Sequence, residues 1–172
     1  EEGQEIYDPN CGSAGLLIKC YLELKQNVNK KKFLPLKLYG QENIPSTWRM
    51  SKMNVFIHNM DCKVELGDTM GSPSFIEKNS LKKFDVVLAN PMWNQDIDTS
   101  YYQNDRYNRF KYGFPTASNA DLGWVQHMIA STKDNGQIAV ILDTGVATRG
   151  SSGDDKSAEL IIRKNILKDD LI

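Results

Sequence analysis

Short apolar runs alternate along the chain with longer stretches in which apolar residues recur at helical spacing. The runs are flanked by polar or turn-forming residues and predict strands at residues 5–7, 36–39, 63–66, 86–89 and 137–142. The helical stretches predict helices after a Ser13 cap, from Pro45, from Ser118 and at residues 157–167. Strands that alternate with helices in this way indicate an α/β fold with a doubly wound, mostly parallel sheet.

Three further stretches give structural predictions, for the burial of a helix, for a loop and for a turn. The helix from Pro45 is rich in apolar residues and is expected to be largely buried against the sheet. Residues 71–79 contain glycine, serine and proline and are expected to form a loop. Asp134-Asn135-Gly136 predicts a turn immediately before the last strand.

The strand at 86–89 ends in the stretch with the clearest candidate chemistry, Asn90-Pro91-Met92-Trp93. Pro91 has no N–H to donate and therefore ends the strand, and it pushes Asn90 into an extended conformation. The carboxyl ends of the strands are where ligands bind in an open α/β sheet. The Asn90 side-chain oxygen and the Pro91 carbonyl are two acceptors that can hold an exocyclic amino group, while Trp93 stacks on its ring. A strand end with an asparagine turn and a buried tryptophan is the alternative interpretation.

A second candidate site follows the first strand, where the sequence reads Ile6-Tyr7-Asp8-Pro9-Asn10-Cys11-Gly12-Ser13-Ala14-Gly15-Leu16-Leu17. A strand, a glycine turn and a helix place backbone N–H groups and a helix amino terminus beside a ligand, although an ordinary β–α turn has the same pattern. Glu42 comes just past the second strand, where an acid binds ribose hydroxyls in dinucleotide folds. A charge at a helix amino terminus is the alternative for Glu42.

Residues 6–17 resemble the S-adenosylmethionine-binding motif of amino-methyltransferases, and Asn90 to Trp93 resembles their Asn/Asp-Pro-Pro-aromatic catalytic motif. The order and separation of the motifs most resemble the modification (M) subunit of type I restriction–modification systems, a family of N6-adenine DNA methyltransferases. Other segments that look familiar from this family are Tyr39-Gly40-Gln41-Glu42, Met53-Asn54, Gly67-Asp68-Thr69, Ala120-Asp121 and Arg149-Gly150.

The resemblance implies that residues 1–172 form the catalytic core of a methyltransferase with a Rossmann-like fold and S-adenosylmethionine as cofactor. The cofactor-binding residues that it implies are Asp8, Pro9, Cys11, Gly12, Ser13, Gly15, Glu42, Asp68 and Asn90. Asp8 would accept from the amino-acid part of the cofactor. Asp68 would accept the adenine amino group, and a plain Gly-Asp-Thr turn is the alternative. The implied catalytic residues are Asn90, Pro91 and Trp93.

The resemblance also implies the partners of the chain. These are duplex DNA with a flipped adenine, a specificity subunit, a second modification subunit and a restriction subunit. Residues 96–117 mix basic and aromatic side chains over a long stretch without a period, which suits phosphate contact and base stacking. We expect this loop to become ordered on DNA, and a mobile surface loop is the alternative.

Two positions depart from the family motifs. Ala14 stands where the family usually has its second glycine, and alanine tolerates positive φ poorly, so Gly15 is expected to take over part of that role. Met92 stands in place of a second proline, which keeps both acceptors and the aromatic ring but loosens the loop. These departures leave open a non-catalytic assembly module with the same fold. A methyltransferase that acts on protein glutamine or on RNA is a further alternative.

Composition and charge limit the binding partners, the chemistry and the cellular compartment that the chain suits. The net charge of −1 is unusual for a protein that binds DNA by itself, because DNA-binding modules usually have a positively charged surface. The three scattered cysteines form no metal-binding pattern and suit a reducing cytoplasm, and the two histidines argue against zinc or histidine-based chemistry. No transmembrane run or signal peptide is visible. The chain lacks an initial Met and ends in what reads as the entry to another strand, so we expect an excised domain of a longer chain.

Overall fold

The structure of the protein is a computed structural model that describes residues 3–27, 34–150 and 157–171. The chain divides into two compact units. The first unit contains Glu1–Asn90 and Ser131–Ala139, and the second contains Pro91–Ala130 and Val140–Ile172. The chain therefore passes from one unit to the other after Asn90, after Ala130 and after Ala139.

The first unit is organised around a five-stranded sheet with the strand order β3-β2-β1-β6-β7. The strands are β1 (Glu5–Asp8), β2 (Lys37–Glu42), β3 (Cys62–Leu66), β6 (Phe84–Ala89) and β7 (Thr132–Val140). The pairs β1–β2, β1–β6 and β2–β3 are parallel, which confirms the predicted mostly parallel sheet. The chain runs outward from β1 to β3 and then returns to place β6 on the other side of β1. The order of strands thus reverses between β1 and β6, and such a switch point is where open α/β sheets bind ligands.

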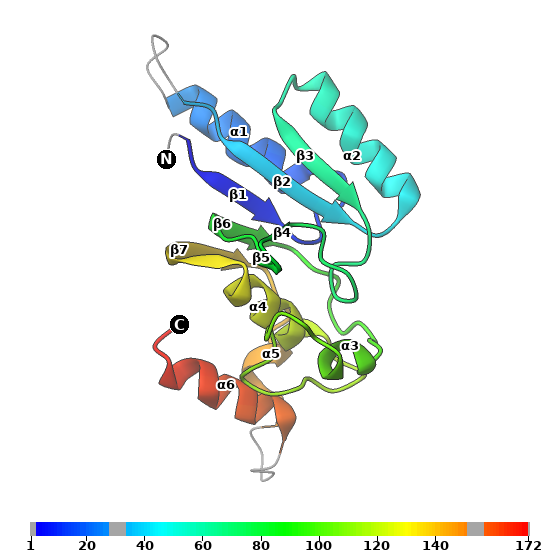
Figure 1. Cartoon of the computed structure of the whole chain (residues 1–172), viewed down its shortest axis with the longest axis vertical. Helices are drawn as coiled ribbons and strands as arrows, with labels where there is room; N and C mark the ends of the chain where they lie inside the picture. Colours follow the sequence, from blue (N-terminus) through cyan, green and yellow to red (C-terminus); the bar gives the residue numbers. More distant parts are fainter. Residues whose placement is uncertain (1–2, 28–33, 151–156, 172) are drawn as a thin grey trace. The chain divides into compact units, whose positions relative to one another are not determined.

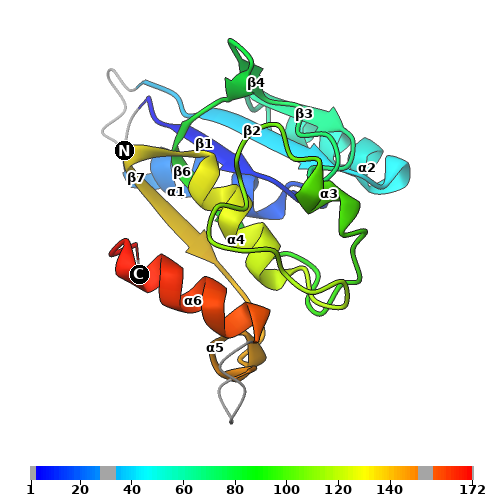
Figure 2. The same ribbon diagram turned by 60° about the horizontal axis from the view of Figure 1, so that its bottom comes forward.

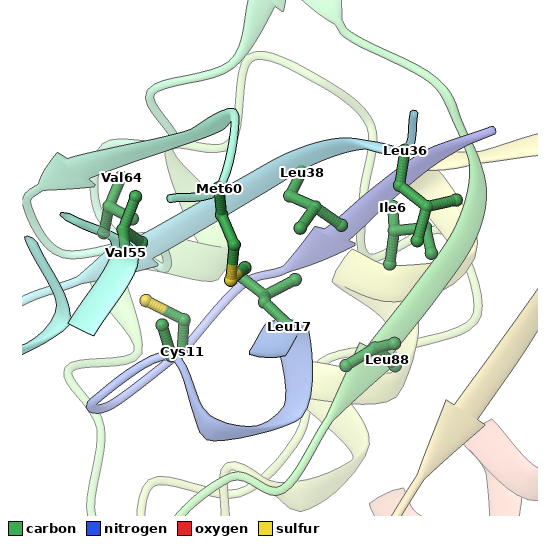
Figure 3. Packing of buried hydrophobic residues seen from close by; sticks show 10 residues of the cluster. Ile6, Cys11, Leu17, Leu36, Leu38, Val55, Met60, Val64 and Leu88 are labelled. Atoms are coloured by element: carbon green, nitrogen blue, oxygen red, sulfur yellow. The ribbon is translucent and has the colours of Figure 1, made fainter. Parts of the chain in front are cut away.

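Helices α1 (Gly15–Asn27) and α2 (Pro45–Ile57) accompany the strands β1, β2 and β3 (Figure 1). Alternate side chains of the strands point to opposite faces of the sheet, so Ile6 and its register partners Leu38 and Val86 share one face. That face packs with Leu17 of α1 and Val55 of α2 in a single apolar cluster (Figure 3).

The opposite face of the sheet carries a cluster of aromatic rings. Tyr7 stacks on Phe84 with ring centroids 4.6 Å apart. Phe75 contacts Tyr7 and Tyr39 edge-on, at 5.4 and 5.3 Å between centroids. Because aromatic pairs add to the energy of burial, this cluster stabilises the centre of the sheet and holds the segment that carries Phe75 against it.

The stretch predicted as a loop at residues 71–79 ends in a small hairpin that the sequence pattern does not predict. Strands β4 (Ile76–Glu77) and β5 (Ser80–Leu81) pair antiparallel across Lys78 and Asn79. Both turn residues have positive φ, 48° and 67°, as a two-residue turn of the primed type requires. The turn is hard to predict from sequence because lysine is an unusual residue in that conformation.

The predicted turn at residues 134–136 falls inside β7, which is assigned as continuous from Thr132 to Val140. The strand is nevertheless sharply bent at this place (Figure 2). A Cβ built on Gly136 would lie 3.0 Å from the Lys133 carbonyl oxygen, although residues three apart in a straight strand are about 10 Å apart. The prediction of a separate turn before the strand is therefore wrong, but the residues do change the direction of the chain.

Helix α2 begins at Pro45 as predicted, but the expectation that it is largely buried is wrong. Only Ser51 and Val55 are buried, whereas Met50, Met53, Phe56 and Ile57 are more than half exposed. The sheet covers the face of the helix that holds Val55 and the partly buried Trp48, and the four exposed apolar residues lie outside that face.

The second unit contains α3 (Ser100–Gln103), α4 (Asp121–Ala130), α5 (Gly145–Thr148) and α6 (Ala158–Lys168). The predicted helices near Ser118 and over residues 157–167 correspond to α4 and α6. Leu122 and Val125 of α4 pack with Ile162 and Ile166 of α6 and with Tyr112 in one core.

Residues 96–117 contain packing contacts of their own, and their ordering on DNA stays a prediction. Tyr102 packs edge-on against Phe110 at 4.6 Å, and both rings are buried. Arg109 is also buried and pairs with Asp105 at 2.6 Å between Nε and Oδ1. Tyr102, Arg109 and Phe110 thus help to pack the segment within the second unit, whereas Arg106, Lys111 and Phe114 are exposed.

Candidate active site

Asp8 is the last residue of β1 and lies next to the switch point of the sheet. Its side chain is buried, and its Oδ1 accepts a hydrogen bond from the Asn10 backbone N–H at 3.1 Å. Burial, reinforced by the charge of Glu42, raises the pKa of Asp8 to about 7. A buried acid that is ready to ionise near neutral pH favours a positively charged ligand group beside it.

Glu42 is the last residue of β2, not a residue beyond it as the sequence predicts. Its Oε2 accepts the Gly12 backbone N–H at 3.0 Å, and its Oε1 accepts the Ile44 N–H at 2.8 Å. Ile44 is the N-cap of α2, so Glu42 also serves the helix amino terminus that was its alternative role. A carboxylate has about four acceptor positions, so two such bonds leave capacity for ligand hydroxyl groups.

The glycine turn between β1 and α1 contains two residues in the left-handed conformation, Gly12 with φ 54° and Ala14 with φ 68°. The Ala14 carbonyl accepts the first helical bond, from Ile18 at 2.9 Å, so Ala14 and not Ser13 immediately precedes the helix. Gly15 does not share the positive φ, so the expectation that it replaces the missing glycine is wrong. Ala14 itself adopts the conformation, at a cost of about 1–2 kcal/mol.

The loop after β3 lies against the same turn. Gly67 donates its N–H to the Glu42 carbonyl at 2.9 Å, and the Thr69 hydroxyl donates to the Pro9 carbonyl at 2.5 Å. Asp68, between them, is partly exposed, and its Oδ1 accepts the Met70 N–H at 3.0 Å. The structure thus brings Asp8, Glu42 and Asp68 to the carboxyl ends of three neighbouring strands.

Two residues that support this arrangement are not singled out by sequence reasoning. Thr69 joins the β3 loop to Pro9, as described above. The Gln41 side chain is fully buried, donates to the Ser72 carbonyl at 3.0 Å and accepts the Ser74 N–H at 2.9 Å. Both belong to segments that resemble the methyltransferase family, Tyr39-Gly40-Gln41-Glu42 and Gly67-Asp68-Thr69, and this is the signal that could have found them.

Cys11, Ser13 and Gly15 occupy different places in the turn. Cys11 is buried, and its N–H donates to the Gln41 carbonyl at 2.9 Å. The Ser13 carbonyl accepts from the Asn54 side chain at 2.9 Å, which ties the turn to α2. Gly15 is exposed and starts α1. The backbone of this turn is therefore held from both β2 and α2.

Asn90 is exposed and follows directly on Ala89, the last residue of β6. Because β6 pairs in parallel with β1, Asn90 and Asp8 leave the sheet at the same ends of adjacent strands. This is the position that the sequence predicts for Asn90.

Pro91 and Trp93 belong to the second unit. Pro91 is buried, and Trp93 is 47% exposed. The Trp93 indole N–H donates to the Ile141 carbonyl at 3.1 Å. The alternative of a buried tryptophan is therefore wrong, since the ring is anchored through its nitrogen and still offers surface to a ligand.

The sheet order and its switch point define the class: this is the fold of S-adenosylmethionine-dependent methyltransferases. A class I methyltransferase of Listeria monocytogenes shares it with a TM-score of 0.73 at 16% identity, over 98% of this chain and 46% of that chain. The family is more particular. Residues 1–172 match the model of the N-6 DNA methylase family, and the chain belongs to that family.

Type I restriction enzyme methylase subunits are among its relatives. The MjaVIII methylase subunit of Methanocaldococcus jannaschii is 35% identical over 100% of this chain, and the HindI methylase subunit of Haemophilus influenzae is 32% identical over 97%. A type I methyltransferase subunit structure from Streptococcus thermophilus has a TM-score of 0.80 at 26% identity, covering 98% of this chain and 34% of that chain. The chain spans 29% and 35% of the length of the two curated relatives.

Proposed function

We propose that this chain is the catalytic core of an adenine-specific DNA methyltransferase, the modification subunit of a type I restriction–modification system. The observation that carries the proposal is the convergence of Asp8 and Glu42 with Asn90 at the ends of the adjacent strands β2, β1 and β6. The first two suit the methyl donor, and the third suits an amino group that receives the methyl.

The chemistry of this donor set fits S-adenosylmethionine. Asp8 and Glu42 are buried acids whose negative charges repel each other, and this repulsion adds to the rise in the pKa of Asp8. A ligand with an ammonium group for Asp8 and ribose hydroxyls for Glu42 would satisfy both. Asp68 would accept the adenine amino group. Pro9, Cys11 and Gly12 would shape the turn, in which the Cys11 and Gly12 N–H groups donate to Gln41 and Glu42. The N–H groups of Ser13 and Gly15 would meet the carboxylate.

The cofactor supplies a methyl group on a sulfonium leaving group, so the protein mainly positions and polarises the acceptor. Asn90 and the Pro91 carbonyl would each accept one N–H of the target amine, which lets its nitrogen pyramidalise and gather electron density. The target base has to leave the duplex, because N6 inside the stack cannot reach the methyl. Trp93 would stack on the flipped adenine, a contact worth about 1–3 kcal/mol.

Sequence recognition would come from another chain. Phosphate neutralisation supplies most non-specific affinity for DNA, and a net charge of −1 provides little of it. We therefore assign recognition of the site to a specificity subunit, and full assembly to that subunit, a second modification subunit and a restriction subunit. The free thiols of Cys11, Cys20 and Cys62 favour a reducing cytoplasm as the setting. No helix in the described part of the chain has the length and hydropathy of a membrane span.

The test is methyl transfer by the full-length protein together with its specificity partner. Labelled S-adenosylmethionine is offered with duplex DNA, with RNA and with a glutamine-containing protein substrate, and the product is identified by mass spectrometry. N6-methyladenine in DNA is the expected product. Transfer to RNA or glutamine instead would overturn the substrate assignment. The absence of both transfer and cofactor binding, the latter measured by calorimetry, would favour a non-catalytic assembly module.

A further inference from the structure

The guanidinium of Arg149 is the centre of a hydrogen-bond network in the second unit. We propose that Arg149 is a positioning residue that fixes the loop carrying Pro91 and Trp93 in the geometry that methyl transfer needs. The inference rests on the proposed function, because it assigns a role to a residue through that loop.

All five N–H groups of Arg149 are used. Nε donates to Glu159 Oε1 at 3.1 Å. Nη1 donates to Asn94 Oδ1 at 3.0 Å and to Asp143 Oδ2 at 3.2 Å. Nη2 donates to Asn119 Oδ1 at 2.9 Å and to Asp121 Oδ2. A planar fork with this many donors is specific to arginine, and lysine has too few donors to replace it.

The network holds Asn94, the residue that follows Trp93. Asn94 has φ 52°, a left-handed conformation that reverses the chain directly after the aromatic residue. Its N–H donates to Asp121 Oδ1 at 3.2 Å, and its side-chain oxygen accepts from Arg149. The backbone turn and the side chain of Asn94 are thus both fixed by the Arg149–Asp121 pair.

Trp93 therefore lies between two anchors. Its indole N–H is held by the Ile141 carbonyl, and the residue after it is held by Arg149 and Asp121. The next residue, Gln95, accepts the Ala120 N–H at 3.1 Å through its carbonyl, which continues the contact of this loop with the start of α4. A ring whose position is set at both ends can stack on a base without first being ordered, which lowers the entropic cost of the reactive geometry.

Arg149 is itself held in place. It is the C-cap of α5, and its carbonyl accepts from Arg163 Nη2 of α6 at 2.6 Å. Its partners Asp121 and Glu159 are buried, with side chains 0% and 9% exposed. Because a buried carboxylate that loses its partner is destabilising, Arg149 also stabilises the fold, and a test has to separate the two roles.

Arg109 provides the matched control for stability. It forms a buried pair with Asp105, as Arg149 does with Asp121, and its bonds to Asp105 and His127 involve none of residues 91–95. Arg109→Gln should lower Tm without changing the loop that carries Trp93. Measurements at a fixed interval below each variant's own Tm then compare folded molecules.

The experiment uses the full-length enzyme with its specificity partner. Arg149→Gln should lower the single-turnover methylation rate by about tenfold or more, whereas the Kd for S-adenosylmethionine should stay within about twofold, because the cofactor residues belong to the first unit. Arg149→Lys should recover part of the rate. Arg109→Gln should keep the rate within about threefold of the parent. A parent-like rate for Arg149→Gln would overturn the inference.

Asn94→Ala tests the same contact without unpairing Asp121. It should reproduce much of the rate loss, and combining it with Arg149→Gln should cost little more than the worse single change, because both remove one coupling. Fully additive losses would contradict the proposal. If Arg149→Gln does not fold, a parent-like rate for Asn94→Ala overturns it.

A second readout does not depend on activity. In a Trp48→Phe, Trp124→Phe background, acrylamide quenching of Trp93 should rise in Arg149→Gln and stay unchanged in Arg109→Gln. If Arg149→Gln increases the quenching of Trp93 but the parent enzyme methylates no adenine, the proposed function is refuted and the role of Arg149 in holding the loop is kept. Unchanged quenching together with a parent-like rate would remove the assignment itself.

Discussion

At the scale of single residues, the candidate cofactor site depends on backbone conformations and charges that are costly to the fold. Ala14 shows the first kind. The sequence identifies it as a poor substitute for glycine, but it does not show that Ala14 adopts positive φ itself with its methyl group fully buried. Local sequence cannot settle this, because the gain from burying the methyl is set by residues elsewhere in the chain.

Ala14→Gly should leave stability unchanged or raise it by up to about 1 kcal/mol. The variant removes a conformational cost of about 1–2 kcal/mol and loses about 0.8 kcal/mol of methyl burial. Gly12→Ala is the matched control: φ is also positive there, and a Cβ would contact nothing within 4 Å, so only the conformational cost remains. Urea unfolding measures both, and an Ala14→Gly variant less stable than Gly12→Ala would contradict the account.

Asp8 carries a charge that is costly to bury, and its titration links the stability of the fold to cofactor binding. Its pKa in the folded chain, about 7, exceeds the ordinary value of 3.8, so protonation favours the folded state. The stabilisation is fully present below the ordinary pKa and is lost as pH rises through the folded one. Asp8→Asn should therefore raise Tm near pH 8, and this gain should shrink toward pH 4.

The same variant should bind S-adenosylmethionine more weakly. In the parent, affinity should rise as pH increases through about 7, because ionised Asp8 attracts the ammonium group. The affinities of parent and variant are compared by calorimetric titration across about pH 6–8. The ionisation of the cofactor itself affects both proteins equally and drops out of the comparison. An equal pH dependence in both proteins would show that Asp8 does not face the cation.

At the scale of elements, the sequence predicts strands and helices well where a periodic run is bounded by turn residues, as for β1, β3, β6 and α4. The sequence pattern fails where the burial or order of a segment depends on contacts with other parts of the fold. Helix α2 has enough apolar residues to be buried on all sides, but the sheet covers only the face that holds Val55. Residues 96–117 lack a period, and their order comes from long-range contacts such as that between Tyr112 and Gln126.

Helix α2 gives a prediction that separates buried from exposed apolar residues. Phe56→Ser, at a side chain 81% exposed, should change the free energy of unfolding by less than about 0.5 kcal/mol. Val55→Ala, one residue away, removes buried methyl groups and should cost about 1.6 kcal/mol. Chemical denaturation of both variants is the measurement, and a cost for Phe56→Ser equal to that for Val55→Ala would show that the outer face is covered.

At the scale of the whole molecule, the low net charge limits what the chain does alone. Residues 1–172 should bind duplex DNA weakly and without sequence preference, because few phosphates are neutralised. Fluorescence anisotropy with two unrelated duplexes at physiological salt tests this. Tight binding to a single sequence without a partner chain would place recognition within this chain and contradict the assignment to a specificity subunit.

The candidate site is more predictable than its support. Asp8, Glu42 and Asn90 follow from the rule that parallel strands expose their carboxyl ends together, which needs only the strand positions. The residues that hold them, such as Gln41, Thr69 and Arg149, act through contacts over long separations in the chain, including Thr69 with Pro9 and Arg149 with Asn94. Such contacts depend on the packed fold, and the resemblance to known motifs marks these residues without explaining them.

Asn90 should contribute far more to holding the target amine than to retaining the cofactor, although the family resemblance also places it among the cofactor-binding residues. In the full-length enzyme with its specificity partner, Trp93→Phe should be mild because a ring remains, and Asp8→Ala should weaken cofactor binding first. The most direct measurement is the initial methylation rate of Asn90→Ala, taken beside its Kd for S-adenosylmethionine. The rate should fall by about 10²–10³-fold with a nearly unchanged Kd, and a rate within a few-fold of the parent would show that Asn90 is not catalytic.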